Sequence, residues 1–195
     1  MREKAVMPCG TGAVKRVTLS IGEYYASREP AVISTLLGSC VSVCLFDPAS
    51  GVGGMNHILL PGRADLTRFN LSARYGINAM ELLINAVMTR GGQRTNLRAK
   101  VFGGASVIPG LIEAQAVGKK LSEFVLTFLA NEGIPVVNRD LGGVYVRNLI
   151  FHTRTGDAFL KKSRSMKSAQ LLWEERKKAE QIRASVKEPT RVTLF

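Results

Sequence analysis

The chain has 195 residues, of which 46% are hydrophobic, and a formal net charge of +12. This length fits one domain with a sizeable core. The longest apolar runs, such as Ala31–Leu37, are far shorter than the roughly 20 residues that cross a bilayer, and no apolar signal segment follows the first four residues. We therefore expect a cytoplasmic protein with no membrane insertion.

The beginning of the chain lacks hydrophobic periodicity. Residues 1–14 contain Pro8, Gly10 and Gly12, which favours a flexible N-terminal arm. Residues 17–21 then alternate between apolar and polar side chains, as in an edge strand. The folded domain is therefore predicted to begin at Lys15 and to extend to Lys162.

A strand and then a β-hairpin, with residues 52–60 as its return strand, are predicted between residues 31 and 60. Ala31–Leu37 is rich in β-branched residues, residues 41–46 alternate, and residues 47–51 read Asp-Pro-Ala-Ser-Gly, a sequence typical of a turn. With the turn centred between residues 48 and 49, Cys40 lies opposite His57 on the return strand, and opposed Cβ atoms lie about 4.5–5.5 Å apart. A register shift of one residue would separate them.

Two helices and several short strands follow. Helical periodicity covers residues 75–88 and 117–133, and each segment ends at glycine. Strands are predicted at 100–102, 134–137 and 144–153, with turns at 140–143 and 155–157. Because hairpin turns outnumber crossover helices, we predict an α/β domain of the α+β type. Its packed β-layers are mostly antiparallel and flanked by two or more helices.

The C-terminal segment 163–195 is predicted to be a basic helical tail. From residue 161 to the end, ten Lys or Arg face four Glu, a net charge of +6, half of the total. The electric field of this positive charge favours an acidic partner; alternatively, the charge only keeps the tail solvated. Nucleic-acid binding is not expected, because Trp173 is the one aromatic residue between the first and last of these charges, Lys161 and Arg191.

Cys40 and His57 are the candidate catalytic pair. A histidine can take the proton of a cysteine thiol and later protonate a leaving amine, which suits acyl transfer from an amide. Gly38 and Ser39 precede the cysteine and are candidates for an oxyanion site built from backbone N–H groups. A third residue that orients the imidazole is expected at Thr35 or, alternatively, at Ser34.

The alternative is structural: Cys40 in the core and His57 a histidine whose hydrogen bonds are satisfied. Cys44 is expected to be a small buried residue, and the three cysteines lack the close spacing of a zinc site. His152 has no second metal ligand nearby, and Gly103-Gly104 lacks the lysine of a phosphate-binding loop. No metal or cofactor is therefore predicted.

Several motifs together resemble the CheD family of chemoreceptor glutamine deamidases. In family order they are TLLGSCVSV at 35–43, FDP at 46–48, GMNH at 54–57, LP at 60–61, RYG at 74–76, FGGAS at 102–106 and DLGG at 140–143 with Arg147. The resemblance covers residues 16–162. It implies a fold similar to the catalytic domain of cytotoxic necrotizing factor toxins.

The resemblance also implies an activity: hydrolysis of glutamine side chains of methyl-accepting chemotaxis proteins to glutamate, through a thioester on Cys40. His57 is then the general base and acid, Thr35 or Ser34 the orienting residue, and the loop of Gly103, Gly104 and Ser106 a candidate wall of the substrate pocket. A phosphatase of the CheC type is a possible partner. The alternatives are a non-catalytic adaptor that binds receptor or phosphatase, and a cysteine protease or transglutaminase with the same thioester chemistry.

Overall fold

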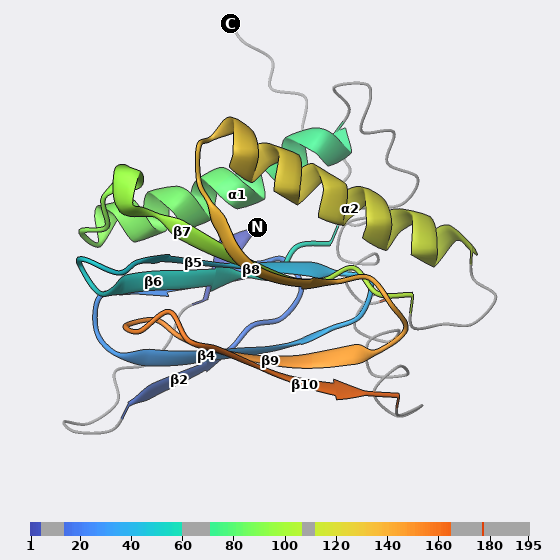
Figure 1. The fold of residues 1–195 in the computed structure, drawn as a ribbon, viewed down its shortest axis with the longest axis horizontal. Coiled ribbons are helices and arrows are strands. Elements are labelled where there is room, and N and C mark those ends of the chain that lie inside the picture. Colours follow the sequence, from blue (N-terminus) through green and yellow to red (C-terminus); the bar gives the residue numbers. More distant parts are fainter. Residues whose placement is uncertain (5–13, 60–70, 107–111, 165–176, 178–195) are drawn as a thin grey trace, which may run out of the picture.

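The computed structural model describes residues 1–4, 14–59, 71–106, 112–164 and 177. They form three layers: two β-sheets packed face to face and a layer of two helices (Figure 1). The six-stranded sheet has the order β1 (Arg2–Glu3), β3 (Glu23–Ser27), β6 (Val52–Asn56), β5 (Val41–Asp47), β7 (Arg98–Gly103) and β8 (Val136–Leu141). The four-stranded sheet has the order β10 (Ala158–Ser163), β9 (Val146–His152), β4 (Ala31–Leu37) and β2 (Lys15–Thr18).

Both helices cover the outer face of the six-stranded sheet (Figure 1). They are α1 (Leu71–Thr89) and α2 (Ile112–Asn131), and a short 3-10 turn, η1 (Arg94–Asn96), precedes β7. Five of the eight pairings between described strands are antiparallel, as predicted. The helices form a single layer because only one face of one sheet is left for them: its other face packs on the second sheet.

Strand β5 lies between two hydrophobic cores. Val41, Val43 and Leu45 point toward the helices, whereas Cys44 and Phe46 point toward the four-stranded sheet. All seven residues of β5 are buried. Residues that alternate along a strand point to opposite faces, so this strand needs apolar side chains on both.

The predicted register of the hairpin is wrong by two residues. Cys44 pairs with Met55 and Asp47 with Val52, so the turn contains the four residues 48–51. The Asp47 side chain explains the longer turn, since its Oδ1 accepts the N–H groups of Ala49 and Ser50 at 2.8 and 3.3 Å. A shift of two residues keeps every side chain on its predicted face.

The start of the N-terminal segment is more ordered than the sequence analysis predicted. Residues 2–3, expected in a flexible arm, form β1 and pair in parallel with β3. Arg2 and Lys4 make ion pairs with the buried carboxylate of Glu23, which holds this segment on the sheet. Most of the predicted C-terminal tail lies outside the described residues.

Candidate active site

The candidate residues lie between the two sheets, where the chain passes from β4 in one sheet to β5 in the other. Gly38, Ser39 and Cys40 make this connection. Cys40, His57 and Thr35 are 4%, 1% and 2% exposed, respectively. The two sheets thus enclose all three side chains.

Cys40 and His57 lie on the same face of the six-stranded sheet. Between them, Val41 and Ile58 exchange both main-chain hydrogen bonds, at 3.0 and 2.8 Å. In this register Cys40 lies opposite Leu59, so His57 is its diagonal neighbour rather than its direct partner. Diagonal neighbours on one face are about 7–8 Å apart, which the imidazole ring can span.

Asn56 interrupts the β5–β6 ladder beside His57. Its side-chain Oδ1, in place of a main-chain carbonyl, accepts the N–H of Val43 at 2.9 Å, and its own carbonyl accepts the Ser42 hydroxyl. Its Nδ2 donates to the carbonyl of Ala79 on α1 at 3.3 Å. Asn56 therefore fixes the backbone next to His57, a role that the sequence analysis did not assign.

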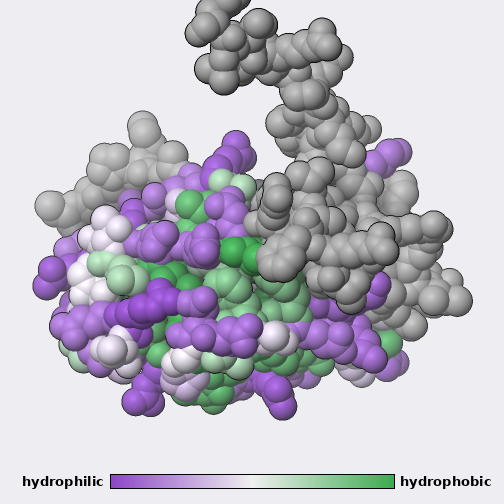
Figure 2. Space-filling view, turned by 90° about the horizontal axis from the view of Figure 1, so that it is seen from above, coloured by the Kyte–Doolittle hydropathy of each residue, from purple (hydrophilic) through white to green (hydrophobic). Residues whose placement is uncertain are grey.

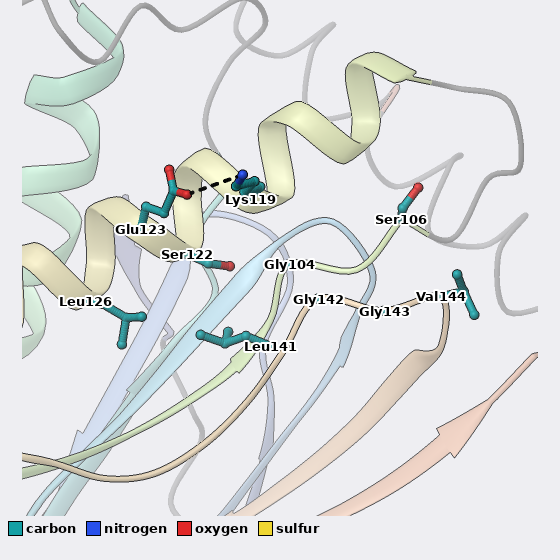
Figure 3. A pocket seen from close by; sticks show the side chains of 10 residues that line it. All are labelled: Gly104, Ser106, Lys119, Ser122, Glu123, Leu126, Leu141, Gly142, Gly143 and Val144. Atoms are coloured by element: carbon teal, nitrogen blue, oxygen red, sulfur yellow. Dashed lines mark ion pairs between the residues drawn. The ribbon is translucent and has the colours of Figure 1, made fainter.

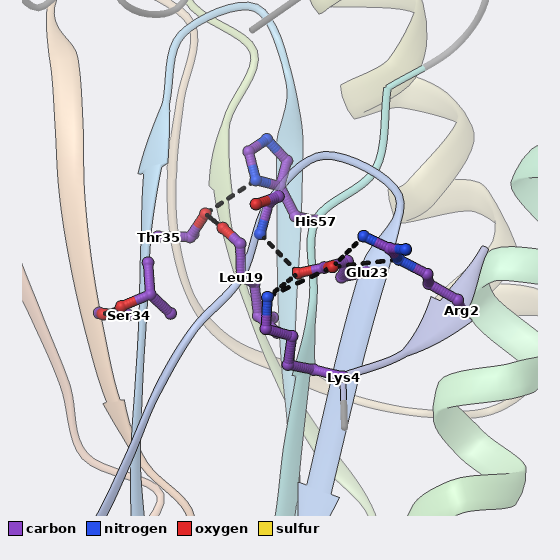
Figure 4. A network of polar contacts seen from close by, with 9 residues as sticks. Arg2, Lys4, Leu19, Glu23, Ser34, Thr35 and His57 are labelled. Atoms are coloured by element: carbon purple, nitrogen blue, oxygen red, sulfur yellow. Dashed lines mark hydrogen bonds and ion pairs between the residues drawn. The ribbon is translucent and has the colours of Figure 1, made fainter. Parts of the chain in front are cut away.

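Hydrogen bonds determine which ring nitrogen of His57 carries a proton. The Thr35 hydroxyl oxygen lies 2.8 Å from the carbonyl oxygen of Leu19 and 2.8 Å from His57 Nδ1 (Figure 4). A carbonyl only accepts, so the single hydroxyl proton goes to Leu19, and Thr35 must accept from an Nδ1–H group. Nε2 is then unprotonated. It is buried and has no hydrogen-bond partner within the described part of the chain.

Burial keeps the imidazole neutral. It lowers the pKa of His57 from 6.5 to about 4, although the Leu19 carbonyl and the Glu23 carboxylate act in the opposite direction. At neutral pH the free Nε2 is therefore available to accept a proton. The related burial of Cys44 raises the pKa of that thiol, which leaves it protonated and unreactive.

Of the two expected orienting residues, only Thr35 contacts the histidine. Ser34, its neighbour on β4, points to the other face of the sheet (Figure 4), where its hydroxyl lies 3.1 Å from that of Thr18. Successive residues of a strand alternate between faces, so both cannot reach the space between the sheets.

The loop after β7 packs directly behind Cys40. The N–H of Gly104 donates to the Cys40 carbonyl at 2.7 Å, and that of Ala105 to the Gly38 carbonyl at 2.8 Å. A Cβ on Gly103 would lie 2.1 Å from the Cys40 carbonyl oxygen. This close approach requires glycine and makes the loop a support for the nucleophile.

We expect Gly103→Ala to destabilise the protein by about 3 kcal/mol or more, because the new Cβ collides with backbone and the φ of +117° disfavours a side chain. Urea unfolding measures the loss. Gly133→Ala is the matched control: its φ is +66° but a Cβ there meets nothing within 4 Å, so only about 1 kcal/mol is expected. Equal losses for the two variants would contradict the close approach.

Gly104 and Ser106 also line a pocket of about 470 Å³ on the helix side of the loop (Figure 3). Its other walls are residues 119, 122, 123 and 126 of α2 and residues 141–144, and the Ser106 N–H donates to the Gly143 carbonyl at 2.8 Å. Cys40 and His57 do not line this pocket. A role for Gly103, Gly104 and Ser106 in binding substrate stays a prediction.

Other kinds of site were sought among the described residues. In this part of the chain no group of three or more His, Cys, Asp or Glu side chains is placed to bind a metal ion. His152 instead packs edge-on against the ring of Phe159, with ring centroids 5.5 Å apart. No described helix is both long and apolar enough to span a membrane.

Comparisons with known proteins identify the family. The family model "CheD chemotactic sensory transduction" matches residues 59–162. A protein of Shewanella oneidensis named "Probable chemoreceptor glutamine deamidase CheD 1" is 47% identical over 77% of this chain and 74% of its own length. A protein of Methylobacillus flagellatus named "Probable chemoreceptor glutamine deamidase CheD" is 44% identical over 84% and 82%. One from Geobacter sulfurreducens is 47% identical over 78% and 79%. The match extends across both sheets and both helices, and the chain belongs to the CheD family.

Proposed function

We propose that this protein is a cytoplasmic protein-glutamine deamidase that hydrolyses glutamine side chains of methyl-accepting chemotaxis receptors to glutamate, with release of ammonia. The observation that carries the proposal is the protonation state of His57. Its Nδ1–H is held by Thr35, and its bare Nε2 lies on the same face as the Cys40 thiol. This is the tautomer that a general base for a nucleophilic cysteine requires.

The first half of the reaction forms a thioester. His57 Nε2 takes the proton of the Cys40 thiol, and the sulfur attacks the carboxamide carbon of the glutamine. The tetrahedral intermediate collapses by breaking the C–N bond, and His57 gives its proton to the departing nitrogen, which leaves as ammonia.

The second half returns the enzyme to its starting state. His57 takes a proton from water, whose oxygen attacks the thioester carbon. The C–S bond then breaks, the side chain leaves as glutamate, and the proton on His57 returns to the sulfur. No step requires an oxidant, a reductant or a metal.

Two backbone N–H groups support an oxyanion site. Within the described residues, neither the Gly38 nor the Ser39 N–H donates a hydrogen bond. Both lie in the connection that leads into Cys40, where the carbonyls of Gly38 and Cys40, on either side of Ser39, accept the N–H groups of Ala105 and Gly104. Donors that are held in place and unused are suited to stabilise the charge on a tetrahedral intermediate.

The mixed apolar and charged surface on the helical side suits contact with a protein substrate. On the helical side, apolar side chains lie among charged ones over the described surface (Figure 2). The net charge of +12 favours an acidic partner and faster association at low salt.

The proposal is tested with purified protein and the cytoplasmic fragment of a chemotaxis receptor. We expect ammonia to be released in step with conversion of particular glutamines to glutamate, measured by peptide mass spectrometry. Backbone cleavage would instead indicate a protease, and incorporation of an added primary amine a transglutaminase. Binding of the fragment without ammonia release would indicate an adaptor and would overturn the proposal.

Family membership also supports a CheC-type phosphatase as a regulatory partner of this chain. If the phosphatase binds close to Cys40, a titration with it should inhibit ammonia release competitively with the receptor fragment. Calorimetry that detects no association would remove this partner without affecting the proposed activity.

A further inference from the structure

A buried carboxylate lies at the far end of the hydrogen-bond chain that begins at His57. Glu23 (Figure 4) is 2% exposed, and its Oε2 accepts the N–H of Ser20 at 3.0 Å. The Ser20 N–H and the Leu19 carbonyl belong to the same peptide group. In a trans peptide these two groups point in opposite directions, and the described residues contain no cis peptide bond.

The hydrogen bonds therefore run without interruption from the carboxylate to the imidazole. Glu23 accepts from the peptide N–H, the carbonyl of that peptide accepts from the Thr35 hydroxyl, and Thr35 accepts from His57 Nδ1. Hydrogen bonds in a chain polarise one another, so an anionic acceptor at one end strengthens the bond at the other. The carboxylate that usually orients a catalytic histidine directly would here act through a peptide group and a hydroxyl.

The backbone around Glu23 is also bonded to that of His57. Gly22 and Glu23 together oppose His57: the Gly22 N–H donates to the His57 carbonyl and the His57 N–H donates to the Glu23 carbonyl, each at 2.9 Å. Two residues facing one make a β-bulge, and the φ of +80° at Gly22 fits its first position. The bulge turns the Glu23 carboxylate back toward Ser20.

Arg2 and Lys4 compensate the buried charge. Arg2 donates to Glu23 Oε1 at 2.8 and 3.1 Å, and Lys4 Nζ lies 3.1 Å from Oε2. Burial raises the pKa of Glu23, but hydrogen bonds from Ser20, Lys4 and Arg2 outweigh it, so the pKa lies below its ordinary value. The group is an anion at neutral pH.

We propose that Glu23 is a positioning residue of the deamidase, which orients His57 through the Leu19–Ser20 peptide and the Thr35 hydroxyl. The inference rests on the proposed function for its kinetic test but not for its spectroscopic one. Glu23 itself contacts neither Cys40 nor the substrate in this scheme, so its removal should lower kcat and leave KM unchanged.

The test compares Glu23→Gln with the wild type and with Asp47→Asn. We expect a loss in kcat of roughly tenfold for Glu23→Gln, because a neutral acceptor replaces a charged one. Asp47 is a matched control: it is 1% exposed and accepts backbone N–H groups, including that of Gln93 at 2.9 Å, but it is the last residue of β5, at the end of the strand away from Cys40. Asp47→Asn should lose stability and keep its kcat.

Nitrogen-15 NMR of the histidine ring provides the readout that a structural role would not change. We expect the Nδ1–H tautomer alone in the wild type and in Asp47→Asn, and a mixture of both tautomers in folded Glu23→Gln. If Glu23→Gln does not fold, Ser20→Pro removes the same hydrogen bond from its other end and keeps the ion pairs of Glu23.

A folded Glu23→Gln with wild-type kcat and an unmixed tautomer would overturn the inference. Failure of the proposed function would give a different result. The wild-type protein would then release no ammonia, while Glu23→Gln would still change the tautomer of His57.

Discussion

Cys40→Ala is expected to abolish glutamine hydrolysis, with a loss in kcat of at least about 10³-fold, because no other group in the proposed site can form the thioester. Ammonia release from the receptor fragment measures the loss. The variant should still fold, since the change removes one sulfur atom from a buried side chain, at a cost of about 1 kcal/mol. Binding of the receptor fragment should be retained.

Cys44→Ala is the matched control. Cys44 lies on β5, the strand that follows Cys40, on the same face of the sheet as Cys40; it is fully buried and packs among apolar residues. Burial raises the pKa of its thiol, so it is no nucleophile. We expect Cys44→Ala to lose a similar amount of stability and to keep its activity. Activity at the wild-type level in Cys40→Ala would contradict the mechanism.

The sequence analysis placed Cys40 and His57 on the same face of the sheet, although it predicted the wrong register for the hairpin and the two residues are not directly opposed. The number of residues in the turn depends on how Asp47 bonds to the N–H groups of Ala49 and Ser50, which the sequence Asp-Pro-Ala-Ser-Gly does not specify. The error was an even number of residues, so both side chains stayed on one face.

The orienting residue was not decided by the sequence for a different reason. Ser34 and Thr35 both carry hydroxyl groups and alternate along β4, so the choice depends on which face of β4 meets the other sheet. That depends on the pairing of β4 with β9, which involves residues more than 100 positions apart. No local pattern contains this information. Thr35 is confirmed as the contact of His57, while its catalytic role stays a proposal.

The sequence analysis did not identify Glu23, because the residues that compensate its charge lie in a segment that was predicted to be a flexible arm. One feature of the sequence pointed to Glu23. It is the single acidic residue of the run Glu-Tyr-Tyr-Ala-Ser, and every residue of this run is buried in the structure. A carboxylate in such a strand needs compensating groups. These come from Arg2 and Lys4, in a segment that was expected to be loose.

His57→Gln is expected to lower kcat by about 10³-fold or more, because it removes the proton acceptor for Cys40 and the proton donor for ammonia. A glutamine side chain can still donate to Thr35, so the fold and the Thr35–Leu19 hydrogen bond should persist. The activity of this variant should not recover at any pH at which the protein stays folded.

The same variant should also change how stability depends on pH. In the unfolded chain His57 binds a proton near pH 6.5, whereas in the folded protein burial delays this until about pH 4. Between these values the unfolded state binds more protons, so the free energy of unfolding falls as the pH falls. A shift of this size corresponds to a loss on the order of 3 kcal/mol from pH 7 to pH 4.

Urea unfolding of the wild type and of His57→Gln at pH 7 and pH 4.5 isolates this effect. Asp47 and Asp140, whose pKa values hydrogen bonds hold below the ordinary range, also reduce stability in acid, but equally in both proteins. The wild type should therefore lose more stability than the variant on acidification. Equal losses would mean that His57 takes up its proton in the folded protein as readily as in the unfolded chain. The imidazole would then be accessible to water, and the enclosed, neutral base on which the mechanism depends would not exist.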